Sequence, residues 1–256
     1  MISEFAQPSN PANKIYLREA TVMQAMGFSD ARESHSEKAT TQFLNEVQRP
    51  EHFTDSADWT EGDRITALLW YHIHVTDDPS VSLPYDCSFC GSPHTNYFDI
   101  RQLTNGYAHL KGAGYRDAVI ADRSITIKPI YGRQSEEIQA ALFGLEGEAA
   151  KNASVLERAI HSITFKGRES SYADCREWIL NLSISNYRIL LTEIDRAHKS
   201  MKHGVPYEYV DGDLCLPAPV HHCINKHKLT DDQKEGAMTS LLWPFLSGDF
   251  IPVLHP

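Results

Sequence analysis

The sequence predicts an α+β fold in which helices combine with short antiparallel strands and two related halves meet at a zinc-ribbon-like knuckle. Apolar residues recur at helical spacing in several segments, and shorter segments alternate polar and apolar residues as strands do. A C-x2-C pair, Cys87 and Cys90, follows one of the predicted strands. The 256 residues, 41% of them hydrophobic, suffice for one large domain or two small ones with a hydrophobic core.

Three parts are expected along the chain. Residues 1–14 carry two prolines and read as an extended N-terminal arm. A first half at 15–120 contains the C-x2-C knuckle, and a second half at 121–256 contains a degenerate knuckle and an apolar C-terminal tail. In the first half, an acidic and polar region precedes the knuckle and holds one helical pattern at 41–47.

The best-marked helix is predicted for residues 60–79, TEGDRITALLWYHIHVTDDP. Glu61 and Asp63 favour its N-terminal end, because acidic groups there interact well with the helix dipole. The run Asp-Asp-Pro ends it. One face is expected to be buried: Ile65, Leu68, Leu69 and either His72 or Ile73.

The same patterns predict the remaining elements. Strands are expected at 81–87, 94–100, 123–130 and 204–209. Helices are expected at 135–161 with a break near 144–147, at 175–182 and at 186–201. Residues 162–167 fit a short strand or an extended connection. The apolar, aromatic end at 236–252 either inserts into a partner or packs back on the chain's own core.

An internal similarity suggests that the halves are related. Residues 63–65, Asp-Arg-Ile, open a helix, and Leu-Pro-Tyr at 83–85 then leads to the knuckle. In the second half Tyr-Arg-Ile at 187–189 lies in a predicted helix, and Val-Pro-Tyr at 205–207 precedes two further cysteines. The matching stretches are short, so a coincidence is the alternative.

The candidate functional site is a structural zinc site. Cys87 and Cys90 can supply two thiolates from one tight turn, with Gly91 relieving the backbone after it. Cys223 and His227 come closest to a second ligand pair. Two other residues are reserve ligands: Cys215 and His222. Four protein ligands would close the site and make the metal structural. The alternative is that the cysteines are buried thiols and the histidines lie at the surface.

No catalytic set is visible, so we expect a protein that is not an enzyme. The chain contains no nucleophile elbow, no phosphate-binding glycine motif and no H-E-x-x-H pair. His72 and His74 point apart on a helix, so His72 is expected beside Trp70 in the core and His74 in solvent. Cys175 lies at helical spacing with Trp178 and is expected in the core.

Composition limits the partners and the compartment. The net charge of −10 disfavours nucleic acid as the main ligand, because phosphate binding needs a basic surface. The basic residues are scattered, in pieces no larger than HKSMKH at 198–203. No run is long and apolar enough to cross a membrane, and the N-terminal residues lack the pattern of a secretory signal. We therefore expect cytoplasmic synthesis and no membrane insertion.

The segment 61–103, EGDRITALLWYHIHVTDDPSVSLPYDCSFCGSPHTNYFDIRQL, resembles a baseplate structural-protein family of contractile-tailed, T-even-like bacteriophages. The family pattern is a GDR-led helix, an extended segment, a C-x-x-C-G knuckle and an acidic strand end. The residues at those places are Gly62, Asp63, Arg64, Cys87, Cys90, Gly91, Asp99, Ile100 and Leu103. Later parts, through Lys128, Gly132, Glu136, Glu137, Trp243, Pro244 and Phe245, are similar to the family's second half.

The resemblance implies a structural or assembly component of the phage tail baseplate hub. Such a protein acts by contacts with other tail and baseplate proteins, without a small-molecule substrate, and belongs to the virion. The family's second C-x-x-C is degenerate here, so the ligands that close the zinc site stay open. The alternative function is a zinc-ribbon adaptor that regulates a nucleic-acid machine in the infected cell.

Overall fold

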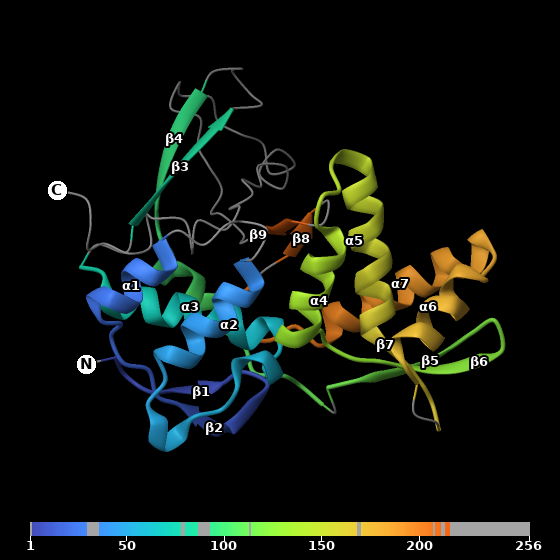
Figure 1. The fold of residues 1–256 in the computed structure, drawn as a ribbon, viewed down its shortest axis with the longest axis horizontal. Coiled ribbons are helices and arrows are strands. Elements are labelled where there is room, and N and C mark those ends of the chain that lie inside the picture. Colours follow the sequence, from blue (N-terminus) through green and yellow to red (C-terminus); the bar gives the residue numbers. More distant parts are fainter. Residues whose placement is uncertain are drawn as a thin grey trace.

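The computed structural model describes residues 2–29, 36–77, 80–86, 93–112, 114–167, 170–206, 208–210 and 213–215. Within these residues helices combine with small antiparallel sheets, which confirms the predicted α+β class. In Figure 1 the helices before residue 76 lie at one end of the molecule, and the helices after residue 146 lie at the other. The predicted zinc-ribbon-like knuckle centres on residues 87–92 and lies outside the described residues.

One hydrophobic core is formed by the first part of the chain. Strands β1 (Phe5–Gln7) and β2 (Asn10–Ile15) pair as an antiparallel hairpin, so the segment predicted as an arm is extended but paired with itself. Three helices lie beside the hairpin (Figure 1): α1 (Val22–Ser29), α2 (Ser36–Glu46) and α3 (Glu61–Val75). The short 3-10 helices η2 (Pro50–His52) and η3 (Ser56–Asp58) lie between α2 and α3. The core includes Phe5, Ile15, Leu17, Phe43, Leu44, Leu68 and Tyr71.

A capping box fixes the start of α3. The Thr60 hydroxyl accepts a hydrogen bond from the Asp63 N–H, and the Asp63 carboxylate accepts one from the Thr60 N–H, both at 3.2 Å. The predicted face is confirmed: Ile65, Leu68, Leu69 and His72 are buried, and Ile73 is half-buried. The helix ends at Val75, before the Asp-Asp-Pro run that was expected to end it.

The helix α3 is followed by an antiparallel hairpin. Strand β3 (Ser80–Asp86) pairs with β4 (Pro93–Asp99) along its whole length, from Ser80 opposite Asp99 to Asp86 opposite Pro93. Both strands were predicted from the sequence. In Figure 1 the hairpin extends away from α1, α2 and α3, and the 3-10 helix η4 (Ile100–Gly106) follows it.

A second hydrophobic core lies between a three-stranded sheet and three helices. The sheet has the order β5 (Arg116–Ile120), β6 (Arg123–Ile127), β7 (Ile163–Phe165), with antiparallel neighbours. The helices are α5 (Gly147–Ser162), α6 (Tyr172–Leu180) and α7 (Ile184–Ser200). The largest buried residues of this core include Ile125, Ile127, Ile160, Phe165 and Leu190.

Helix α4 (Gly132–Leu142) and residues after α7 join the two cores. An isolated bridge pairs Thr60 with Tyr131, and the Glu61 N–H donates to the Ile130 carbonyl at 3.0 Å. After α7, Gly204 pairs with Ala108. A last antiparallel hairpin, β8 (Glu208–Val210) and β9 (Asp213–Cys215), follows. A helix and then a hairpin thus occur in both parts, as α3–β3–β4 and α7–β8–β9.

Most predicted elements are present with shifted ends. The break expected near 144–147 separates α4 from α5, and the segment at 162–167 contains β7. The strand expected at 204–209 is shorter, since regular pairing begins at Glu208. Helix α1 and strand β5 were not predicted.

Candidate functional site

The predicted zinc ligands lie at or beyond the edges of the described residues. Cys87 and Cys90 belong to the six-residue connection between β3 and β4, which begins directly after the pair Asp86–Pro93. Cys215 is the last residue of β9, where only the backbone is described. Three predicted or reserve ligands lie outside: His222, Cys223 and His227. The apolar end at 236–252 lies outside as well. Among the described residues, no group of three or more histidine, cysteine, aspartate or glutamate side chains could hold a metal ion.

Cys175 is a core residue, as predicted. It lies in α6, almost fully buried in the second core, and its sulfur lies 3.6 Å from the Ile163 carbonyl oxygen. His72 is buried as expected and His74 is exposed. The ring that packs against Trp70, however, is that of His74, at 4.6 Å between centroids.

A buried polar joint lies where the chain after α7 contacts the start of α3. The Nδ1 of His203 donates to the Met201 carbonyl at 2.6 Å, so in the neutral ring Nε2 accepts from the Thr60 hydroxyl, also at 2.6 Å. The Asp63 carboxylate lies 4.0 Å from Nε2. It accepts hydrogen bonds from the side chains of Gln7 and Ser9 and from the Ser9 N–H, at 2.6 to 2.9 Å.

The Thr60–His203 pair has the spacing of a nucleophile and its base, but its surroundings favour a structural role. Thr60 is only 3% exposed, and its oxygen also accepts the Asp63 N–H as the helix cap. Gly62 and Gly204 are tightly packed in the same joint: a Cβ on Gly62 would lie 2.7 Å from the His203 carbonyl oxygen, and one on Gly204 would lie 2.2 Å from the Thr66 hydroxyl. We therefore interpret the pair as part of a close-packed joint.

Arg64 is a buried guanidinium with an incomplete hydrogen-bond set. Its Nη2 contacts both the carbonyl (2.8 Å) and the carboxylate (3.1 Å) of Glu37. Its Nη1 has no hydrogen-bond partner and lies against Gly132, where a Cβ would come within 2.1 Å of it. A side chain at position 132 would therefore displace the guanidinium, and it would also meet the Ser56 carbonyl oxygen at 2.8 Å.

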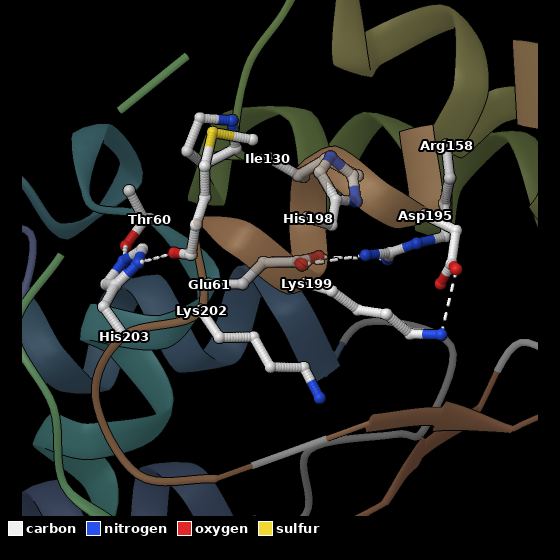
Figure 2. Close-up of a pocket in the computed structure, with 11 residues that line it drawn as sticks. Thr60, Glu61, Ile130, Arg158, Asp195, His198, Lys199, Lys202 and His203 are labelled. Carbon is white, nitrogen blue, oxygen red and sulfur yellow. Dashed lines mark hydrogen bonds and ion pairs between the residues drawn. The ribbon is translucent and has the colours of Figure 1, made fainter. Parts of the chain in front are cut away.

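Beside the joint is a cavity of about 320 Å³, shown in Figure 2. On one side Glu61 forms a two-fold ion pair with Arg158 of α5, at 2.8 and 3.0 Å, and accepts the Ser135 hydroxyl at 3.1 Å. The end of α7 and the residues after it supply further polar and charged side chains: Asp195, His198, Lys199, Lys202 and His203. Pro129, Ile130 and Met201 add apolar surface.

Burial lowers the pKa of several histidines. The pKa of His72 falls to about 4, because the charged ring would lose its hydration. Burial also lowers the pKa of His198, with a smaller contribution from the nearby Arg158 charge. The Nε2 of His198 donates to the Lys128 carbonyl at 3.1 Å. The pKa of His161 is lowered by burial in spite of the neighbouring carboxylates of Glu137 and Glu157.

Comparison with protein-family models, curated proteins and solved structures gives no match. No helix in the described part of the chain is both long enough and apolar enough to span a bilayer. What the chain does has to be inferred from its own residues.

Sequence reasoning did not find the cavity. Glu61 was interpreted only as a helix start, and the basic stretch at 198–203 only as a piece too short to bind nucleic acid. Arg158 was not considered. The one available signal was that stretch, in which Lys199 and Lys202 stand out in an acidic chain.

Proposed function

We propose that the chain acts by contacts with other proteins, as a structural or assembly component of the tail baseplate hub of a contractile-tailed bacteriophage, without catalytic turnover. The observation that carries the proposal is the resemblance of residues 61–103 to the baseplate family. The secondary structure in this segment has the order of the family pattern: a helix that begins at the GDR motif, then two strands on either side of the C-x2-C pair.

The proposal includes a structural zinc ion held by Cys87, Cys90, Cys223 and His227, with Cys215 and His222 as reserve ligands. Support comes from the β3–β4 hairpin. Its two strands stay in register up to Asp86 and Pro93, so the two cysteines lie in the sequence between two paired strand ends. A C-x2-C pair at such a place can supply two thiolates to a tetrahedral metal. The ion would stabilise the fold and would not take part in a reaction.

Exposed apolar side chains support a role in protein contacts. Ile184, at the start of α7, is 74% exposed, and Leu180 precedes it by one short connection. Val119 on the edge strand β5 is 68% exposed. Such side chains mark a site of association where they form a contiguous patch.

The test is a quantitative mass-spectrometric inventory of purified phage particles and of infected-cell lysate. The proposal expects the chain in particles at a fixed, small copy number relative to the tail proteins. Its absence from particles, with abundant chain in the lysate, would contradict a place in the virion. Zinc is measured separately on protein purified without chelators, and less than about half an ion per chain would contradict the metal site.

A further inference from the structure

A second cavity, of about 350 Å³, lies between β1, α3 and the residues at and after the end of η4. We call it the aromatic cavity, because four of its lining side chains are rings: Phe5, Trp70, Tyr107 and His109. No lysine, arginine, aspartate or glutamate is among its lining residues. Independently of the function proposed above, we propose that this cavity binds a small uncharged aromatic molecule with a hydroxyl group that donates to Nε2 of His109.

Three of the rings offer surface to a ligand. Trp70 and Tyr107 are half-buried and His109 is exposed, whereas Phe5 and Leu69 are buried and contribute little. The volume is within the range of small-molecule pockets, which are lined mainly by apolar and aromatic side chains. Rings also gain from contact with another ring beyond the area that they bury. An aromatic body therefore fits this lining.

Hydrogen bonds hold two of these rings in place. The Nε1 of Trp70 donates to the Ser3 carbonyl at 2.8 Å, and the His74 ring packs against the same indole with 4.6 Å between centroids. The Tyr107 hydroxyl donates to the Ala6 carbonyl at 2.9 Å. These walls are set before a ligand arrives, which lowers the entropic cost of binding.

The polar side chains of the lining are mostly engaged within the protein. The Thr66 hydroxyl donates to the Gly62 carbonyl at 2.7 Å, and the Thr104 hydroxyl donates to the Arg101 carbonyl at 2.6 Å. The two rings described above also donate to backbone carbonyls. A charged ligand would lose its hydration without meeting an opposite charge among the lining side chains. The lining therefore favours an uncharged ligand.

His109 supplies an acceptor for such a ligand. Its Nδ1 lies 3.4 Å from the Tyr107 hydroxyl oxygen. Because that hydroxyl gives its hydrogen to Ala6, Nδ1 of the neutral ring is the donor in this contact, and Nε2 carries the lone pair. No described residue forms a hydrogen bond with this Nε2. A hydroxyl on the ligand matches it, since an ether or a carbonyl has no hydrogen to donate.

The experiment is a 19F NMR titration of the full-length protein labelled with 5-fluorotryptophan. The ligands are phenol, anisole, in which a methyl ether replaces the hydroxyl, and benzoate, which is charged. The Trp70 signal, assigned from Trp70→Phe, should shift saturably with phenol, while the Trp178 signal from the second core should not. Benzoate should bind at least about tenfold more weakly than phenol.

Three outcomes with the unaltered chain would each overturn the proposal. One is the absence of a saturable Trp70 shift up to about 20 mM phenol, a generous limit for a ligand of this size; the cavity would then be a packing gap. The second is a shift of Trp178 as large as that of Trp70. The third is binding of benzoate as tight as that of phenol.

Matched variants test the hydrogen bond. His109→Phe keeps a ring at the cavity and removes Nε2, and His109→Leu is a second variant without an acceptor. In both, the ratio of phenol affinity to anisole affinity should fall at least about threefold. His52→Phe makes the same change at an exposed histidine that stacks on Tyr16, outside the cavity, and should leave the ratio unchanged. An unchanged ratio in the His109 variants would overturn the proposal.

Discussion

Replacing His72 should make the protein less sensitive to acid. His72 is 6% exposed, and burial lowers its pKa from 6.5 to about 4. The folded state thus binds the proton less tightly than the unfolded state. Above pH 6.5 His72 is neutral in both states and does not lower the free energy of unfolding. Between pH 6.5 and about 4 the unfolded state takes up the proton first, so the free energy of unfolding falls. This difference in pKa corresponds to a loss of about 3 kcal/mol in the free energy of unfolding below pH 4, of which about 2 kcal/mol falls between pH 7.5 and pH 5.

The assay is urea unfolding at pH 7.5 and pH 5.0 for the wild type, His72→Gln and a matched control, His74→Gln. His74 lies on the same helix and is exposed. Burial also lowers the pKa of His161 and of His198. Both residues remain in all three proteins, so their contribution to the pH dependence of unfolding cancels in the comparison. The free energy of unfolding should fall between the two pH values by about 2 kcal/mol less in His72→Gln than in the other two proteins. An equal fall in all three would refute the reasoning.

Three other predictions concern stability. Gly132→Ala should lower the free energy of unfolding by about 2 kcal/mol, because the new Cβ would meet the Arg64 guanidinium; a loss below about 0.5 kcal/mol in urea unfolding would contradict that packing. The turn residues Ala121 and Asp122 have φ of 48° and 62°, so Ala121→Asn with Asp122→Gly should stabilise by about 1 kcal/mol, and an unchanged or lower midpoint would contradict the strain. Chelator treatment should lower the melting temperature of the wild type but not of a variant with serine at both cysteines of 87–90; equal effects would contradict a zinc site there.

The elements that could be predicted are those whose signals are local. Helix α3 has an acidic first turn, an N-cap residue at Thr60 and an apolar face, all within one segment. Strands β3 and β4 were predictable from the short runs on either side of the cysteine pair. These patterns act over neighbouring residues, so no tertiary information was needed.

The elements that were missed lack such signals. In α1, the apolar residues Val22, Met23 and Met26 are exposed while Ala25 is buried, so the sequence shows no clean apolar face. Strand β5 begins with two charged residues, Arg116 and Asp117, and its turn to β6 lacks the Asn-Gly signal of a two-residue hairpin. The cavity joins Glu61 to Arg158 across 97 positions, a pairing that a local pattern cannot show.

The polar joint explains why the cavity lies where it does. Each hydrophobic core draws on one continuous part of the chain, while the contacts around Thr60, Asp63 and His203 link these parts by directed hydrogen bonds. A buried carboxylate with four donors tolerates few arrangements, because any shift leaves a polar group without a partner. Apolar side chains therefore cannot close the space next to the joint as they close a core. The gap that remains is lined largely by polar and charged side chains, among which only the Glu61–Arg158 pair is mostly buried.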